Sequence, residues 1–177
     1  MFFLPGMLIS IITFPGVVVH EMAHQLFCRL CRVSVLDVCY FRFGNPSGYV
    51  IHETPKNPAH HLLIGIGPFL VNSTLGAIIA APGIVPVVQF ETGGIVHYFL
   101  VWLGVSIAMH AFPSTGDAKS IWKATMSREC PALLRVAAVP LVVLIYVGAI
   151  GSVFWLDLIY GIGVAMLIPQ LIVSAFA

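Results

Sequence analysis

The sequence predicts an all-α polytopic membrane protein with about five transmembrane helices and a small membrane-associated β-hairpin. Of its 177 residues, 59% are hydrophobic and only 8% are charged, and the mean hydropathy is +1.02. A soluble domain carries about 25% charged residues, so this composition excludes an ordinary water-soluble globule. With 8 basic residues against 7 acidic ones and only 4 cysteines, a nucleic-acid binder, a disordered chain and a disulfide-stapled secreted module are also excluded.

Five stretches of the chain approach the roughly 20 apolar residues that a helix needs to cross a bilayer. The first opens the chain without any ionisable side chain and lacks the basic residues of a secretory signal. We therefore expect it to be a retained helix, kinked at Pro15 and Gly16. The five stretches cover residues 1–19, 62–90, 92–116, 136–156 and 158–177.

Proline residues predict where two of these helices end. Pro82 predicts that the second helix ends near Ala81, and Pro113 predicts that the third ends near Phe112. Only the neighbourhood of Asp157 separates the last two stretches. A tight hairpin between them is therefore the simplest connection.

The basic residues predict the orientation of the chain in the membrane. Five spans place the loop after the first span and the loop after the third span on the same side, and all 8 basic residues fall in these loops. Because loops rich in Lys and Arg stay inside, we expect a multi-pass protein of the cell membrane with its N-terminus outside. The basic residues are Arg29, Arg32, Arg42, Lys56, Lys119, Lys123, Arg128 and Arg135.

Residues 33–54 do not fit a transmembrane span and predict a β-hairpin. They are rich in Val, Tyr and Phe, and residues 44–48 (Gly-Asn-Pro-Ser-Gly) form a turn signal in their middle. An open strand edge cannot face hydrocarbon unpaired. The hairpin therefore either lies at the cytoplasmic interface or has its edge covered by another segment, including a bound peptide.

The helix that begins with the first stretch continues past residue 19 and contains the pattern His20-Glu21-x-x-His24. Only roughly 0.006 chance occurrences of this pattern are expected in a chain of this composition. Residues four apart share one face of a helix, so both imidazoles can bind one Zn²⁺ ion while leaving a position open for water. Glu21 is then placed to take a proton from that water as the general base. A charged side chain near the bilayer centre costs about 2.5–3.5 kcal/mol, so an acid at this position indicates a function.

Asp117 is the best candidate for the third zinc ligand that a catalytic site needs. It follows the third span at the cytoplasmic end, at a depth similar to that of His20 and His24. The alternative role for Asp117 is to cap a helix over residues 118–126, which is a common role for Asp. We favour the ligand role because the two imidazoles still lack an anionic partner.

These residues resemble the site-2 protease family of intramembrane zinc metalloproteases, over about residues 15–119. The His-Glu-x-x-His motif inside a membrane helix is the strongest element. Gly67-Pro68 followed by Asn72 and Leu75 is similar to the family's Gly-Pro-x-x-Asn-x-x-Leu, and residues 113–117 are similar to its Asn-x-x-Pro and Asp-Gly segment.

The resemblance implies roles for particular residues. His20, His24 and Asp117 would bind zinc, Glu21 would act as the base, and Asn72 would steady the substrate or the oxyanion. The hairpin over residues 33–54 would hold an extended substrate by strand addition.

Three departures from the family pattern concern the same motifs. Asn72 lies one residue further along, Asp117 lies one residue nearer to Pro113, and Ala118 replaces the Gly. His110 also stands where the family has Asn. This substitution leaves His110 open as an alternative metal ligand.

The expected function is that of an intramembrane zinc metalloendopeptidase in a single domain, with a core over residues 1–126 and additional helices over residues 131–177. It would cleave an extended transmembrane segment of another membrane protein near the cytoplasmic face, and nucleic acid is not an expected partner. A metal-binding transporter is one alternative, but the last two spans contain no ionisable residue apart from Asp157. A non-catalytic binder of membrane proteins is another, but binding alone would not require Glu21.

Overall fold

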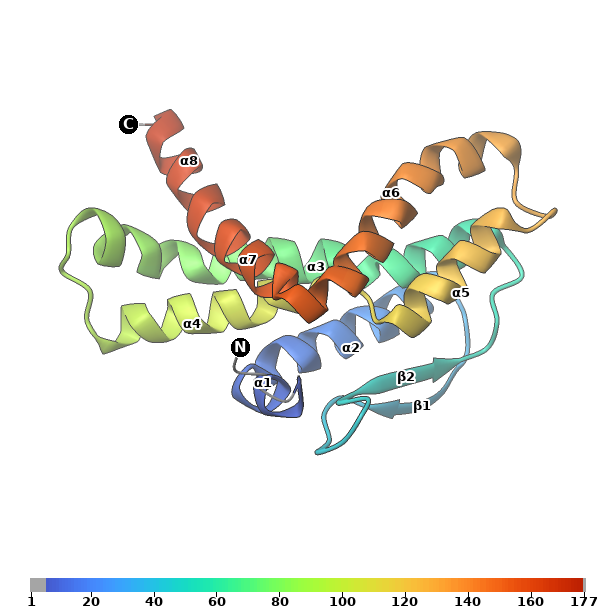
Figure 1. The fold of residues 1–177 in the computed structure, drawn as a ribbon, viewed down its shortest axis with the longest axis horizontal. Coiled ribbons are helices and arrows are strands. Elements are labelled where there is room, and N and C mark those ends of the chain that lie inside the picture. The colour runs from blue at the N-terminus through green and yellow to red at the C-terminus, as the bar shows by residue number, and fades with distance from the viewer. Residues whose placement is uncertain (1–5, 177) are drawn as a thin grey trace.

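The computed structural model describes residues 6–176 and is mostly helical with a two-stranded sheet (Figure 1). The predicted helical fold class with a small hairpin is therefore confirmed. The expected first span is two helices, α1 (Gly6–Ile12) and α2 (Phe14–Leu30), which are separated at Thr13. Pro15 does not kink a helix, because it stands in the first turn of α2, where its missing N–H group costs nothing.

The predicted hairpin consists of β1 (Val35–Cys39) and β2 (Tyr49–His52). The strands pair antiparallel, with Cys39 opposite Tyr49 and Val35 opposite His52, and the register shifts between Val35 and Asp37. The turn residues 44–48 join them, as predicted. The Tyr40 hydroxyl donates a 2.6 Å hydrogen bond to Gln25 of α2, which fastens the hairpin to that helix.

The longest helix, α3 (Pro58–Ile84), continues as the π-helical segment η1 (Val85–Gln89). The prediction that this helix ends near Ala81 is wrong, because Pro82 lies inside it. Packing explains the difference: α4 (Ile95–Met109) runs antiparallel beside α3 (Figure 1), and an apolar helix held by a neighbour tolerates a proline. Small residues such as Gly76, Ala80 and Gly104 allow the two backbones to approach closely.

The second half of the chain contains α5 (Thr115–Met126), α6 (Ala132–Gly151), the 3₁₀ turn η2 (Ser152–Phe154), α7 (Leu156–Ile162), the π-helical η3 (Gly163–Leu167) and α8 (Ile168–Phe176). The expected tight hairpin near Asp157 is wrong. Figure 1 shows α6 and α8 leaving this corner toward opposite ends of the long axis. Trp155 turns the chain there in a left-handed conformation, with φ at 62°.

Within the described residues, two helical segments are long and apolar enough to cross a membrane, Pro58–Val88 and Ala132–Gly151. The structure therefore does not support the expected five spans. The other apolar stretches are interrupted: α4 has only 15 residues, or about 22 Å at 1.5 Å per residue, against a hydrocarbon core of about 30 Å. Leu156–Leu171 is also a shorter apolar helix.

We predict that Gly104→Ala destabilises the protein. A Cβ atom at this position would lie 2.6 Å from both the Ala80 Cβ and the Gly76 carbonyl oxygen, so the backbones of α3 and α4 would have to separate. Overpacking of this kind costs about 1–3 kcal/mol. Gly163→Ala is the matched control, because nothing lies within 4 Å of its Cβ position. Thermal unfolding in detergent measures both variants, and equal melting temperatures would contradict the close packing of α3 and α4.

Candidate metal centre

Helix α2 carries the His-Glu-x-x-His motif on its buried face. The exposed fractions of His20, Glu21 and His24 are 9%, 8% and 7%. The two imidazole rings lie edge to face, with their centroids 4.9 Å apart. Gly16 holds this face against α4, because any side chain there would collide with the Ser106 carbonyl oxygen. The helical spacing therefore turns both imidazoles toward the same space, as predicted.

Backbone carbonyl groups fix the orientation of both imidazoles. His20 Nδ1 lies 2.7 Å from the His110 carbonyl oxygen, and His24 Nδ1 lies 3.0 Å from that of Ile64. A carbonyl oxygen only accepts hydrogen bonds, so we assign the proton of each ring to Nδ1. In a neutral imidazole this leaves the Nε2 lone pair free, which is the usual arrangement of a metal-binding His.

Asp117 lies in the first turn of α5, where it is held by Ser114. The Ser114 N–H and hydroxyl groups both donate to Asp117 Oδ2, at 3.1 and 2.6 Å. The Asp117 N–H group donates in return to the Ser114 Oγ atom, at 3.2 Å. This reciprocal pair is a capping box. The N-cap itself is Ser114, so Asp117 takes part in capping and also faces the imidazoles.

Hydrogen bonds from Ser114 favour the charged form of Asp117. Burial raises the pKa of its carboxyl group and these hydrogen bonds lower it, and the pKa lies below its usual range. The carboxylate form is therefore favoured. This is the protonation state that a metal ligand needs.

The contact between His24 and Asp117 is one that a cation could bridge. His24 Nε2 is buried without a hydrogen-bond partner, and Asp117 Oδ2 lies 3.8 Å from it. With the ring proton on Nδ1, both atoms are acceptors, and 3.8 Å is too long for a hydrogen bond. The candidate ligand atoms of His20, His24 and Asp117 all lie within 4.8 Å of one another. Two imidazoles and one carboxylate are a donor set that fits zinc.

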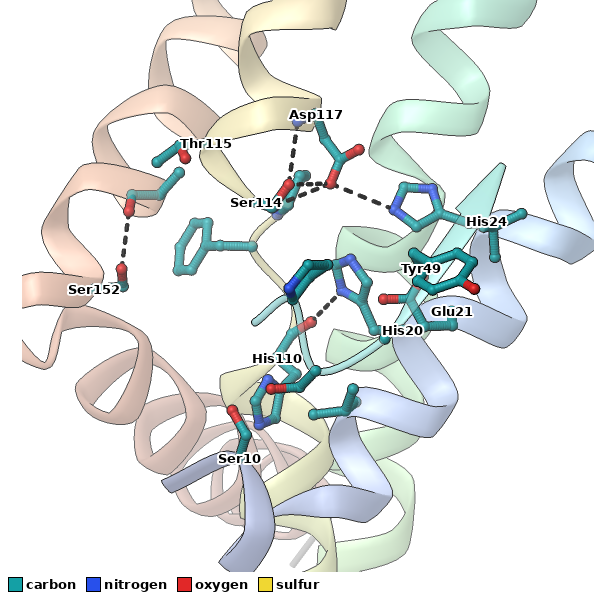
Figure 2. A pocket seen from close by; sticks show the side chains of 18 of the residues that line it. Ser10, His20, Glu21, His24, Tyr49, His110, Ser114, Thr115, Asp117 and Ser152 are labelled. Atoms are coloured by element: carbon teal, nitrogen blue, oxygen red, sulfur yellow. Dashed lines mark hydrogen bonds and ion pairs between the residues drawn. The ribbon is translucent and has the colours of Figure 1, made fainter. Parts of the chain in front are cut away.

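Figure 2 shows these side chains around a cavity of about 470 Å³. Glu21 points into it from α2, and the turn of the hairpin covers Glu21 from the outside. A Cβ atom at Gly48 would lie 2.7 Å from Glu21 Cγ, so only glycine permits this approach. The hairpin turn, the metal ligands and the candidate base therefore border the same space.

Asn72 is fully buried and is not among the residues that line this cavity. Its Nδ2 group donates to the carbonyl oxygens of Gly16, Ile107 and His110, at 3.1, 3.0 and 3.2 Å. The structure thus places Asn72 behind the site, where it joins α3 to α2 and α4. Through the His110 carbonyl group it also positions His20.

The His110 imidazole is not part of the three-residue cluster. Its Nε2 atom lies 2.8 Å from the Thr13 hydroxyl oxygen, and that hydroxyl donates its own proton to the Ile9 carbonyl group at 2.7 Å. His110 therefore contributes its carbonyl oxygen, and not its ring, to the orientation of His20 (Figure 2).

Three features of the site were not anticipated from the sequence. The role of Ser114 had a detectable signal, since Ser-x-x-Asp before a helix is the capping-box pattern. The carbonyl groups of Ile64 and His110 have no such signal, because every residue has one. Asp157 also lines the cavity, although the sequence placed it at the opposite membrane face.

Comparison with protein-family models, curated proteins and solved structures finds no match for this chain. The likeness to site-2 proteases therefore remains one of motifs, namely the His-Glu-x-x-His helix, the hairpin and the acidic residue after Pro113.

We predict that zinc binding depends on all three clustered residues. The purified protein should hold about one zinc ion per chain, whereas His20→Ala and His24→Ala should hold almost none because each leaves only two ligands. Asp117→Asn keeps a capping oxygen but loses the anion, and its zinc affinity should fall at least about 100-fold. Elemental analysis after dialysis and the absorption of bound Co²⁺ measure this. His97→Ala is the control, since His97 caps α4; equal zinc content in all variants would contradict the site.

We also predict that Asn72 and His110 respond differently to truncation. Asn72→Ala removes the buried amide that donates to three carbonyl groups and joins α3 to α2 and α4, so stability should fall by about 1–3 kcal/mol and zinc affinity by about tenfold. His110→Ala keeps the carbonyl group that orients His20 and should bind zinc normally. Competition titration well below the melting temperature separates the two effects. Unchanged zinc affinity in Asn72→Ala would limit Asn72 to a structural role.

Proposed function

We propose that this protein is an intramembrane zinc metalloendopeptidase. One observation carries the proposal: the unpaired Nε2 lone pair of His24 faces the Asp117 carboxylate in a cavity that Glu21 also lines. A bound cation would pair with both the His24 Nε2 lone pair and the Asp117 carboxylate. Glu21 would lie beside that cation, where a general base is needed. A purely structural metal site is closed by four protein ligands, whereas the cluster here has three members.

The outer faces of the helices support a place in a bilayer. Along α6, the exposed fractions of Val136, Val143, Val147 and Ile150 are 73%, 44%, 55% and 51%. Such a contiguous apolar face is unfavourable in water. We infer that α3 and α6 cross the membrane, and that the shorter apolar helices complete a multi-pass arrangement of about five segments.

The charges support an orientation with the site toward the cytoplasm of a cell membrane. In Figure 1, the end of α2, the start of α3, the end of α5 and the start of α6 lie at one end of the long axis. Six of the 8 basic residues belong to these ends or to the adjoining loops, namely Arg29, Arg32, Lys56, Lys123, Arg128 and Arg135. Ile64, which bonds His24, is six residues or about 9 Å from the start of α3.

The chain's own groups account for the chemistry as follows. His20, His24 and Asp117 would hold a zinc ion, which supplies a Lewis acid and an activated water when bound. Glu21 accepts a proton on its carboxylate and delivers it to the departing amine. Burial of Glu21 beneath Gly48 keeps bulk water from competing for that proton.

The hairpin is the proposed binding surface for the substrate. A peptide bond in an intact helix is shielded by its neighbours, so the substrate has to unwind locally. A two-stranded sheet has a free edge on each strand, and an extended peptide can pair with such an edge. Because the turn of the hairpin contacts Glu21 at Gly48, a peptide paired there would pass the candidate base.

We predict that Glu21→Gln separates metal binding from cleavage. The protein in proteoliposomes is incubated with a mixed library of synthetic transmembrane peptides, and mass spectrometry identifies the products. Glu21→Gln should keep its zinc and lose cleavage at least about 100-fold, whereas His20→Ala should lose both. Glu129→Gln, an exposed acid in the loop before α6, is the control. Full cleavage by Glu21→Gln would exclude Glu21 as the base.

The same proteoliposomes distinguish a peptidase from a metal transporter. Zinc uptake into the vesicles that depends on His24, without any peptide cleavage, would overturn the peptidase proposal in favour of transport. Cleavage without uptake would support it.

A further inference from the structure

Asp157 is an acidic residue that the proposed chemistry does not use, yet it borders the candidate active-site cavity. It lies in the first turn of α7, beside the corner at Ser152–Phe154. Asp157 is half-buried at this corner, where α6 and α8 diverge (Figure 1). The cavity thus extends from the metal ligands on α2 and α5 to the start of α7.

The Asp157 carboxylate is only partly satisfied. Its Oδ1 atom accepts a 2.8 Å hydrogen bond from the N–H group of Leu158, an ordinary contact at the start of a helix. Within residues 6–176, no basic side chain lies within 4.0 Å of either Asp157 oxygen. The described residues that line the cavity also include neither Lys nor Arg. A half-buried carboxylate without a cation is unfavourable, so an incoming cation would provide the missing partner.

The wall of the cavity suits a long basic side chain. Val17, Met109, Phe112 and Ala149 contribute apolar surface, along which the methylene groups of Lys or Arg can lie. The Ser152 and Thr115 hydroxyl groups lie on the other side of the cavity from Glu21 and Tyr49 (Figure 2). They offer hydrogen-bond acceptors near the same end as Asp157.

We propose that Asp157 forms a specificity subsite that binds a basic side chain, Lys or Arg, of the peptide being cleaved. This inference rests on the proposed peptidase function, since it names the kind of substrate that the same cavity accepts. A peptide held along the hairpin past Glu21 would direct this side chain away from the hairpin, across the cavity and toward α7. The protein would then select transmembrane segments that carry a basic residue near the unwound part.

The test measures binding separately from cleavage. Glu21→Gln protein in nanodiscs is titrated with acetylated, amidated transmembrane peptides in which Arg, Met or Glu occupies each central position in turn. We expect at least one position where the peptide with Arg binds about tenfold more tightly than the peptide with Met. This preference should vanish when Asp157→Asn is combined with Glu21→Gln. Asp157→Lys should reverse the preference toward Glu. The control Glu129→Gln should keep the preference for Arg. Equal zinc content shows that each variant retains its fold.

The outcomes separate this inference from the proposed function. A preference for Arg that persists in Asp157→Asn, or no preference at any position, would overturn the subsite even if the wild-type protein cleaves peptides. An Asp157-dependent preference without cleavage by the wild type would keep the subsite and overturn the peptidase.

Discussion

The carbonyl oxygen of His110 is the atom on which the candidate metal centre depends. It lies 2.7 Å from His20 Nδ1 and 3.2 Å from Asn72 Nδ2, so one atom after α4 orients a ligand on α2 and is itself positioned from α3. Asn72 also reaches the carbonyl groups of Gly16 and Ile107. Three helices therefore have to keep their relative positions for the His20 ring to face the cluster. The preorganisation that a catalytic metal site requires arises from helix packing.

The ends of the helices supply unpaired backbone N–H and carbonyl groups, which the interior of a regular helix lacks. The last carbonyl groups of a helix and the first N–H groups have no partner within it. After α4 ends at Met109, the free His110 carbonyl group orients His20; where α5 begins, the Ser114 N–H group holds Asp117. The corner before α7 places Asp157 on the same cavity. A bilayer tolerates non-helical backbone where it is buried in protein or lines a cavity, so these breaks are compatible with the proposed membrane placement.

This arrangement explains which parts of the molecule could be predicted from the sequence. The pairing of His20 with His24 follows from helical spacing alone, and the turn residues at 44–48 predict the hairpin. Asp117 could be selected because so few acids compete with it. The role of Asn72 as a tie between helices could not be predicted, because it depends on carbonyl groups from distant segments. Hydropathy does not show where a helix is interrupted, so only two of the five expected stretches are helices long and apolar enough to cross a membrane within the described residues.

The different surroundings of the acids in the cavity argue for different roles. Asp117 receives two hydrogen bonds from Ser114, which stabilise its charged form and suit a permanent ligand. Glu21 has no hydrogen-bond donor among the described residues and is enclosed by Gly48. A base has to gain and lose a proton during each cycle, so a carboxylate that no donor holds in the charged form is better suited to it. The different surroundings of the two acids thus support the proposed roles, with Asp117 as the ligand and Glu21 as the base.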